Sequence, residues 1–430
     1  MINNNILHVN LNREGSVTRR ELLRLTGGGF AGLTGIGFLQ TLGLNAAELK
    51  RSGRACIMVF LNGAPSQMET WDPKPDHENG GETKAIQTRI AGVNFAEYWP
   101  KLAGTMDQMS VIRSVAGKEA AHERGRYHLR TGHRLLGPTK FPHFGSLVAH
   151  KLGDPDSDIP NFVSIGNTVS SGFLGVEVAP FVVNQAGQLP ENVKGLLAGS
   201  RASRRLEMLQ AQDRSFADAG AQKIAHEHQE LYRKASAMMV SSRLPAFTLE
   251  GEPQSVQNRY GANAFGKSCL VARRLVDCGV PFVEVQRGGW DMHQNLWQNI
   301  PNVAAEADQG VSALVTDLQE RGLLEKTVVI CLGEFGRTPK INNKTPAVGR
   351  DHWAKNFNLL IGGGGIKGGV CVGATSDDGM EITNRPVSVD DLFATLCTAM
   401  TIDPFEELIT PEGRPLAIAA EGETISEILG

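Results

Sequence analysis

Residues 327–339 read TVVICLGEFGRTP, a run of apolar, β-favouring residues followed by a polar, glycine-containing turn. A short apolar run of this kind is typical of a strand that is buried on both faces of a parallel sheet. Ligands of such sheets bind beyond the carboxyl ends of the strands, and here Glu334 and Arg337 follow the run. The stretch therefore predicts a buried parallel strand with a candidate functional site at its end.

The rest of the chain alternates between short apolar runs and longer stretches of helical character. We expect further strands at residues 55–61, 109–114, 162–165, 281–286 and 357–361. We expect helices at residues 122–130, 264–278, 303–321 and 389–400. Strands that alternate with helices predict an α/β fold, with a mainly parallel sheet and helices on both of its faces.

Residues 51–430 contain no internal repeat and no low-complexity linker, so we expect them to form one domain. Within it, residues 195–250 are polar and helical in pattern, which predicts an excursion from the core. The six cysteines are scattered and form no C-x-x-C pair. This spacing predicts free, mostly buried thiols rather than a zinc site or a disulfide framework.

The first segment, residues 1–50, differs in composition from the rest. Arg19 and Arg20 precede a glycine-rich, weakly apolar stretch at residues 27–44, which predicts a twin-arginine signal. Such a signal implies the twin-arginine translocase as a partner and export to the periplasm. The alternative is an amphipathic helix capped by Thr18, which the glycines at 27–29 disfavour. No clear cleavage site follows this segment. The sequence is therefore compatible with its removal and with its retention as a membrane tether.

The sequence pattern argues against two classes of function, nucleic-acid binding and nucleotide binding. The formal net charge is −3 and no basic stripe is interleaved with aromatic residues, so a nucleic-acid partner is not expected. Residues 261–268, GANAFGKS, match a phosphate-binding loop letter for letter. The segment before them is polar and contains Pro253, whereas such a loop needs a buried strand there. We therefore expect Lys267 to lie exposed at a helix start.

Carboxylates and imidazoles gather in the loops beside the predicted strands. Asp291 and His293 are two residues apart, so in an extended segment they point the same way. With Glu334 and His352 they would bind one divalent cation, and Asp351 would support a ligand or the ion. Such mixed ligands suit zinc, manganese, calcium or iron. The alternative is that Asp291 caps a helix and His293 bonds to a backbone carbonyl.

Two further groups of polar residues could complete a site. His122, Arg126 and Arg130 are spaced to share one face of the predicted helix at 122–130, and arginines suit phosphate or sulfate. The alternative is an ordinary solvated helix face. Asn62, Ser66 and Glu69 follow the predicted strand at 55–61, so they are candidate pocket residues. For Ser66, turn chemistry after a proline is an equally good interpretation.

Several specific strings occur in one order along the chain: FLNGAPSQMETWDPKPD, TGH, GGWDMH, LGEFGRTPKI, GRDHW and GGGGIKGG. Over residues 54–403 the chain resembles the exported bacterial family known as domain of unknown function fifteen-oh-one, which is abundant in planctomycete-like bacteria. That family belongs to the alkaline phosphatase and sulfatase superfamily. The resemblance implies an alkaline phosphatase/sulfatase-like α/β fold, and a twin-arginine leader is typical of the family.

The resemblance also implies roles for single residues. Asp291 and His293 match the superfamily's Asp…His metal pair, and His352 matches its last histidine. His122 stands at the nucleophile position. Two departures matter, because Asn62 replaces the first-strand acid and Phe335 replaces a metal-binding histidine. The resemblance therefore implies at most one well-formed metal site.

These observations favour an exported, metal-dependent hydrolase of phosphate or sulfate esters, acting on an anionic small molecule or a sulfated glycan. In this hypothesis His122 is the nucleophile or a general acid/base, unless hydroxide generated at the cation attacks directly. Arg126 and Arg337 neutralise the anion. The alternative hypothesis is a catalytically inactive superfamily member that binds a glycan or a protein with the same pocket.

Overall fold

The computed structural model describes residues 53–191, 200–343, 347–419 and 421–430. The part from Gly53 to Gly430 forms one compact unit. The predicted twin-arginine segment, with Arg19 and Arg20, lies outside the described residues. Among the residues that the structure describes, no helix is both long and apolar enough to cross a membrane.

The core is a nine-stranded sheet in the order β12-β4-β11-β8-β1-β7-β5-β6, with β15 paired to β4. Its strands are β1 (Ala55–Leu61), β4 (Met109–Ala116), β5 (Phe162–Ile165), β6 (Phe181–Val183), β7 (Phe282–Arg287), β8 (Thr327–Leu332), β11 (Phe357–Gly362), β12 (Cys371–Val372) and β15 (Val387–Ser388). The central strand β1 pairs in parallel with β7 and with β8. Among the described strands of this sheet, only β11 runs antiparallel to its neighbours, which are β4 and β8. The predicted mainly parallel sheet is confirmed.

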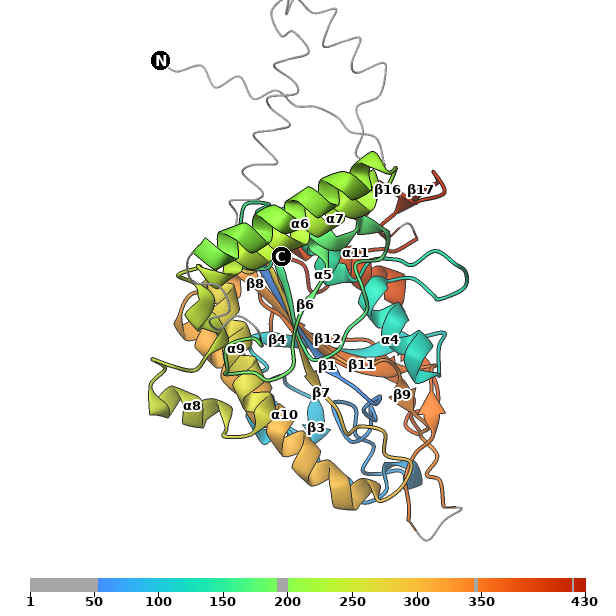
Figure 1. Cartoon of the computed structure of the whole chain (residues 1–430). Coiled ribbons are helices and arrows are strands. Elements are labelled where there is room, and N and C mark those ends of the chain that lie inside the picture. The colour runs from blue at the N-terminus through green and yellow to red at the C-terminus, as the bar shows by residue number, and fades with distance from the viewer. Residues whose placement is uncertain (1–52, 192–199, 344–346, 420) are drawn as a thin grey trace, which may run out of the picture. The chain divides into compact units, whose positions relative to one another are not determined.

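Helices cover both faces of the sheet. Successive side chains of β1 point to opposite sides, and every residue of this strand is buried. Ile57, Val59 and Leu61 pack with α9 (Ala264–Asp277) and α10 (Leu296–Glu320). Met58 and Phe60 lie in the second core cluster. That cluster also contains residues of α4 (His122–Thr131), α5 (Phe144–Leu152) and α11 (Val389–Ala399). Figure 1 shows the sheet between these two helical layers.

Smaller elements complete the described unit. They are α3 (Pro100–Ala103), α8 (Gln254–Tyr260), η1 (Glu78–Gly80), η2 (Gly172–Leu174), η3 (Val176–Val178), η4 (Leu244–Phe247) and η5 (Leu324–Lys326). Two-stranded sheets are formed by β2 (Ala85–Gln87) with β3 (Asn94–Ala96), β9 (Gly336–Arg337) with β10 (His352–Trp353), β13 (Ala374–Thr375) with β14 (Ile382–Asn384), and β16 (Glu407–Ile409) with β17 (Pro415–Ala417).

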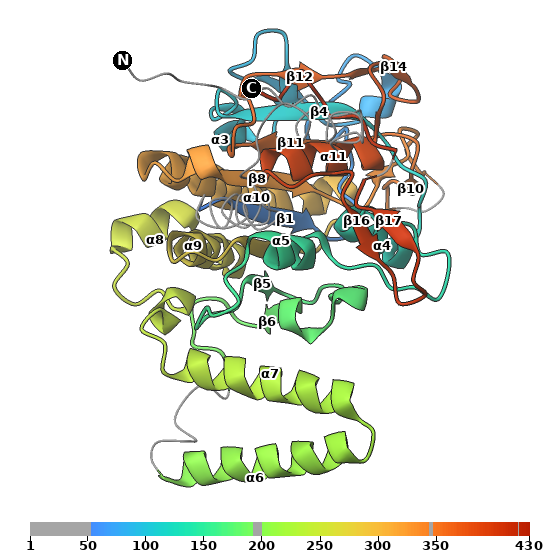
Figure 2. The same cartoon turned by 90° about the horizontal axis from the view of Figure 1, so that it is seen from above.

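The predicted helical excursion is a pair of helices, α6 (Ser200–Asp218) and α7 (Gln222–Met239). The chain turns between them at Gly220, whose φ of 98° is a left-handed conformation that favours glycine. Met238 of α7 is buried in the core cluster. Figure 2 shows α7 beside the body of the unit and α6 on its outer side. The excursion therefore contacts the core mainly through its second helix.

Other predictions can be compared with the structure directly. The phosphate-loop match is preceded by helix α8 rather than by a strand, and Lys267 is exposed in the first turns of α9. The N-cap of α9 is Asn263, whose side chain accepts a hydrogen bond from Gly266 N at 2.7 Å. All six cysteines are free. Helix α10 begins at Leu296, earlier than the predicted 303, because it continues through Pro301.

Candidate metal centre

The candidate residues come from five adjacent strands of the sheet. The chain leaves β1, β4, β7 and β8 at the carboxyl edge and enters α4 or loops that carry Gly63, His122, Asp291 and Glu334. His352 precedes β11, but β11 is antiparallel, so its beginning lies at this same edge. The short pair β9–β10 then sets His352 opposite Arg337. The topology thus brings residues that are far apart in the sequence to one place.

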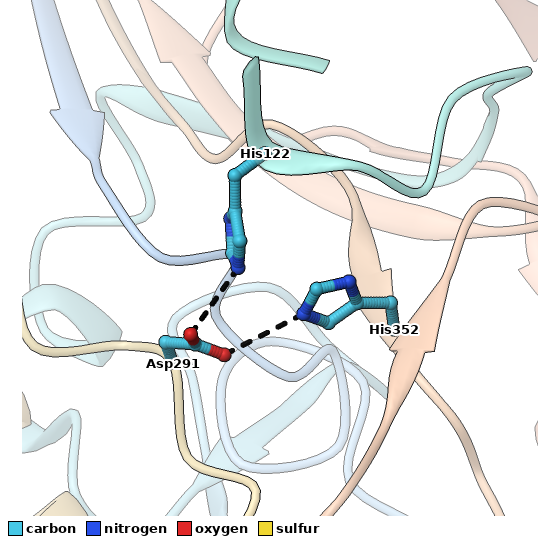
Figure 3. A group of neighbouring side chains, drawn as sticks. All are labelled: His122, Asp291 and His352. Carbon is cyan, nitrogen blue, oxygen red and sulfur yellow. Dashed lines mark ion pairs between the residues drawn. The ribbon is translucent and has the colours of Figure 1, made fainter. Parts of the chain in front are cut away.

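Three side chains form the centre of this cluster: His122, Asp291 and His352. Each can offer one ligand atom, and these atoms all lie within 4.8 Å of one another. His122 Nε2 is 3.3 Å from Asp291 Oδ2, and His352 Nε2 is 3.6 Å from Asp291 Oδ1. Figure 3 shows both imidazoles directed at the carboxylate between them. His122 was predicted as a catalytic residue, and the structure places it among the candidate ligands.

His293 lies beside this group. Its Nε2 is 3.1 Å from Asp291 Oδ1 and 3.0 Å from His352 Nε2. Its Nδ1 is 3.0 Å from Asp351 Oδ1. The cluster therefore contains three imidazoles and one central carboxylate, with Asp351 on its outer side.

Each of the three histidines has an oxygen atom against its Nδ1. These oxygens are Glu334 Oε1 at 2.7 Å from His122, Asp351 Oδ1 at 3.0 Å from His293, and Ala120 O at 2.8 Å from His352. Carbonyl and carboxylate oxygens accept hydrogen bonds, so each Nδ1 donates its proton. The other ring nitrogen, Nε2, faces the Asp291 carboxylate in all three histidines. In metalloproteins this arrangement of outer partners orients histidine ligands.

Glu334, predicted as a metal ligand, lies behind His122. Its carboxylate is buried and accepts from the backbone N–H of Gly63, at 3.0 Å to Oε1 and 3.2 Å to Oε2. His122 Nδ1 donates to the same Oε1. The Nε of Arg126 lies 3.6 Å from that oxygen. Glu334 therefore contacts the central group through His122.

Arg337, predicted to neutralise a substrate anion, is buried beneath the cluster with 2% of its surface exposed. Its guanidinium donates to Ala64 O at 2.9 Å, Gly63 O at 2.6 Å, Arg350 O at 3.2 Å, His293 Nε2 at 3.3 Å and Asp291 Oδ1 at 2.5 Å. Burial raises the pKa of Asp291, but the hydrogen bond and charge of Arg337 outweigh it and bring the pKa down to about 2. Arg337 thus fixes Asp291 in its ionised form.

Arg126 has a different environment. It follows His122 by one helical turn, and 39% of its side chain is exposed. Its Nε has no hydrogen-bond partner among the described residues. A half-exposed guanidinium beside the cluster can bind an anionic group from solvent.

The hydrogen bonds of the predicted pocket residues after β1 are made with residues other than the histidines. Glu69 is fully buried and pairs with Arg350 through two hydrogen bonds of 2.9 and 2.7 Å. Ser66 is buried and its Oγ accepts from Met68 N at 3.3 Å, which is turn chemistry. Asn62 lies at the end of β1, where its backbone N–H donates to Arg287 O.

Arg350 is a structural residue of the site whose role sequence reasoning missed. It is fully buried and joins Glu69 to the backbone oxygens of Asn79 and Thr338. These contacts tie the loop after β1 to the loops that carry Arg337 and His352. The string GRDHW contains Arg350, but nothing in the spacing indicates a partner so distant in the sequence.

Gly63 permits the close approach of the loop after β1 to Asp291. Its φ is +118°, and an added Cβ would lie 2.6 Å from Asp291 N and 2.9 Å from Trp290 N. We expect Gly63→Ala to displace Asp291, to destabilise the fold by about 1–3 kcal/mol, and to weaken metal binding by about ten-fold or more. Denaturant unfolding and metal titration measure the two effects.

The matched control is Gly288→Ala, because an added Cβ there meets nothing within 4 Å. This control should keep both the stability and the metal affinity of the original protein. Equal metal affinity in the two variants would show that the approach at Gly63 is not needed for the site.

The fold and the cluster define an α/β protein with a candidate metal centre made of imidazoles and carboxylates. Residues 53–429 match the family described as Protein of unknown function (DUF1501), and the chain belongs to this family. The family predicted from the sequence is therefore confirmed. No curated protein matches the chain.

Solved structures similar to the chain include a sulfatase, a phosphonate monoester hydrolase and an alkaline phosphatase. One is a sulfatase from Pseudoalteromonas sp., 14% identical, with a TM-score of 0.36 over 83% of this chain and 72% of that one. Another is a phosphonate monoester hydrolase of Agrobacterium radiobacter, 10% identical, with a TM-score of 0.37 over 87% and 77%. An alkaline phosphatase from an Antarctic bacterium is 10% identical, with a TM-score of 0.35 over 81% and 98%.

Proposed function

We propose that this protein is an exported, metal-dependent hydrolase of phosphate or sulfate esters. The observation that carries the proposal is the orientation of three histidines, each held at Nδ1 by an oxygen and each directing Nε2 toward Asp291. Export rests on the predicted signal at Arg19 and Arg20.

The distances from the histidines to Asp291 are close to those that one cation would require. Ligand atoms about 2.0–2.1 Å from a tetrahedral zinc ion lie about 3.4 Å from one another. The Nε2 atoms of His293 and His352 lie 3.1 and 3.6 Å from Asp291 Oδ1, and that of His122 lies 3.3 Å from Oδ2. His122 Nε2 is buried and has no hydrogen-bond partner among the described residues, and a cation would satisfy it. In this proposal the four side chains bind the cation, and His293 Nε2 then bonds to the cation in place of Arg337 Nη1.

The donor set narrows the choice of metal. Three imidazole nitrogens and one carboxylate suit zinc, iron or manganese, whereas calcium prefers oxygen ligands. When bound, such an ion would act as a Lewis acid that polarises an ester oxygen and activates water. In this proposal His122 binds the cation through Nε2, while Glu334 and Asp351 orient the rings of His122 and His293.

The two arginines of the cluster have different roles in this proposal. Arg337 keeps Asp291 ionised and fixed in position, since its hydrogen-bonding directions are taken up by the protein. Arg126 is partly exposed, so its guanidinium would bind the phosphate or sulfate group of the substrate. This interaction would strengthen as negative charge accumulates on the reacting group in the transition state.

The proposal is tested by hydrolysis of p-nitrophenyl phosphate and p-nitrophenyl sulfate with zinc, manganese or iron, and after chelation. We expect turnover of one ester that chelation abolishes and added metal restores. Arg126→Ala should raise KM by about ten-fold, because one charge-assisted hydrogen-bonding partner of the anion is lost. The control Arg124→Ala should leave KM unchanged, since Arg124 pairs with Glu119 outside the cluster. Metal binding without turnover of either ester would contradict the proposal and favour a binding protein.

A further inference from the structure

A surface cavity lies at the other end of α4 from His122. Its volume is about 450 Å³, within the range of about 300–1,000 Å³ that is usual for ligand pockets. Its wall includes Lys118, His128, His133, Arg134, Phe141 and Asp390. None of the described residues that line it belongs to the candidate metal centre, so the cavity is a separate feature.

His128 is a buried polar residue in this wall. It is 5% exposed, and its Nδ1 is buried without a hydrogen-bond partner among the described residues. An unsatisfied buried nitrogen costs about 1–3 kcal/mol, and a hydroxyl group that reached it from the cavity would remove this cost. Burial lowers the pKa of His128 to about 4, so the ring is neutral at pH 7 and offers one donor and one acceptor.

The cations of the cavity are balanced by carboxylates. Arg134 Nε donates to the buried Glu119 at 2.8 Å. The charge of Lys118 acts on Asp390, which also lines the wall. Because each of these positive groups has an acid beside it, the cavity favours a neutral ligand with many hydroxyl groups over a simple anion.

Two stacked rings form part of the cavity wall. The rings of His133 and Phe141 stack with centroids 4.1 Å apart and an interplanar angle of 25°. Burial lowers the pKa of His133 to about 4, so this stacked pair is uncharged at neutral pH. A flat, apolar ring surface next to hydrogen-bonding groups matches a sugar ring, which has C–H groups on its faces and hydroxyls on its rim.

We propose that this cavity binds a sugar residue, with the His133–Phe141 pair against the ring and His128, Arg134 and Asp390 on its hydroxyls. The site is independent of ester hydrolysis, because its lining residues are separate from the proposed metal ligands. A protein that lacks hydrolytic activity would therefore still bind the sugar here.

The test uses saturation-transfer NMR with the methyl α- and β-glycosides of glucose, galactose, mannose and N-acetylglucosamine. We expect at least one glycoside to bind, and Arg134→Ala to weaken its binding by about ten-fold through loss of the charged donor. Arg124→Ala is the matched control, because Arg124 pairs with the same Glu119 at 2.9 Å but does not line the cavity. That variant should bind the glycoside as the original protein does.

A second variant, His133→Ala, removes one of the stacked rings and should also weaken binding. It tests the proposal if Arg134→Ala fails to fold. The proposal is overturned if no glycoside binds, if Arg124→Ala weakens binding as much as Arg134→Ala, or if only inorganic sulfate or phosphate binds in the cavity.

Discussion

Alanine at both Asp291 and His352 should remove the bound metal and lower kcat/KM for the hydrolysed ester by about a thousand-fold. Both side chains belong to the proposed ligand set, and Asp291 lies between the three histidines. A catalytic cation contributes several kcal/mol to transition-state stabilisation, and each factor of ten in rate corresponds to about 1.4 kcal/mol. Plasma mass spectrometry and steady-state kinetics on the purified variant measure the two losses.

Asp291 and His352 are both partly exposed, but alanine at Asp291 also removes a carboxylate partner of the buried Arg337, so circular dichroism is used to check that the double variant is folded. His226→Ala is a matched control, since His226 Nε2 also faces a carboxylate, Glu177, at 3.3 Å but lies on α7. The control should retain its full metal content and activity. Full metal content in the double variant would contradict the proposed ligand set.

Substituting Arg130 by methionine should destabilise the protein by about 3–5 kcal/mol, which is the usual effect of leaving one buried charge without its partner. Arg130 donates to Glu284 Oε1 from Nε at 2.9 Å and from Nη2 at 2.6 Å. Glu284 is fully buried on β7, and it also faces His143 Nε2 at 2.9 Å and Thr168 Oγ1 at 2.6 Å. Denaturant unfolding of Arg130→Met measures the loss.

The destabilisation expected for Arg130→Met arises from the charge of Glu284. Burial raises the pKa of this carboxyl, but the charge of Arg130 and the hydrogen bond from His143 outweigh it and lower the pKa to about 2. A folded-state pKa below the ordinary 4.5 means that the pair stabilises the fold above pH 4.5. That stability is lost as the pH falls from about 4.5 to about 2. The difference between the original protein and Arg130→Met should therefore shrink over this range.

A double variant, Arg130→Met with Glu284→Gln, separates charge from packing. It should recover part of the lost stability, because glutamine carries no charge and still offers an oxygen to His143 and Thr168. If the double variant is no more stable than Arg130→Met, the loss arises from packing alone. Arg130 and His122 share α4, so the anchored end of this helix also supports the metal cluster.

The regular elements could be predicted because burial leaves a clear pattern in the sequence. The runs at 55–61 and 327–332 coincide with β1 and β8, and the helix predicted at 122–130 ends next to Gly132, whose φ is +77°. Apolar composition reports burial but not direction. For this reason the antiparallel course of β11 could not be predicted, although it is what brings His352 to the site.

The candidate site could be predicted as a set of residues but not as an arrangement. Asp291, His293 and His352 were expected together, and their side chains do lie together. The positions of Glu334 behind His122 and of Arg337 beneath Asp291 depend on contacts between loops that are distant in the sequence. Residue type and spacing contain no information on which loop lies under another, so the arrangement required the structure.

The central claim, that His122, Asp291, His293 and His352 bind one cation, is tested most directly by anomalous diffraction from crystals of the zinc-loaded protein. The account predicts one anomalous peak at the zinc absorption edge, about 2.0–2.2 Å from the three Nε2 atoms and from the Asp291 carboxylate. A fully loaded crystal with no peak inside this cluster, or with zinc bound only at other surface histidines, would contradict it.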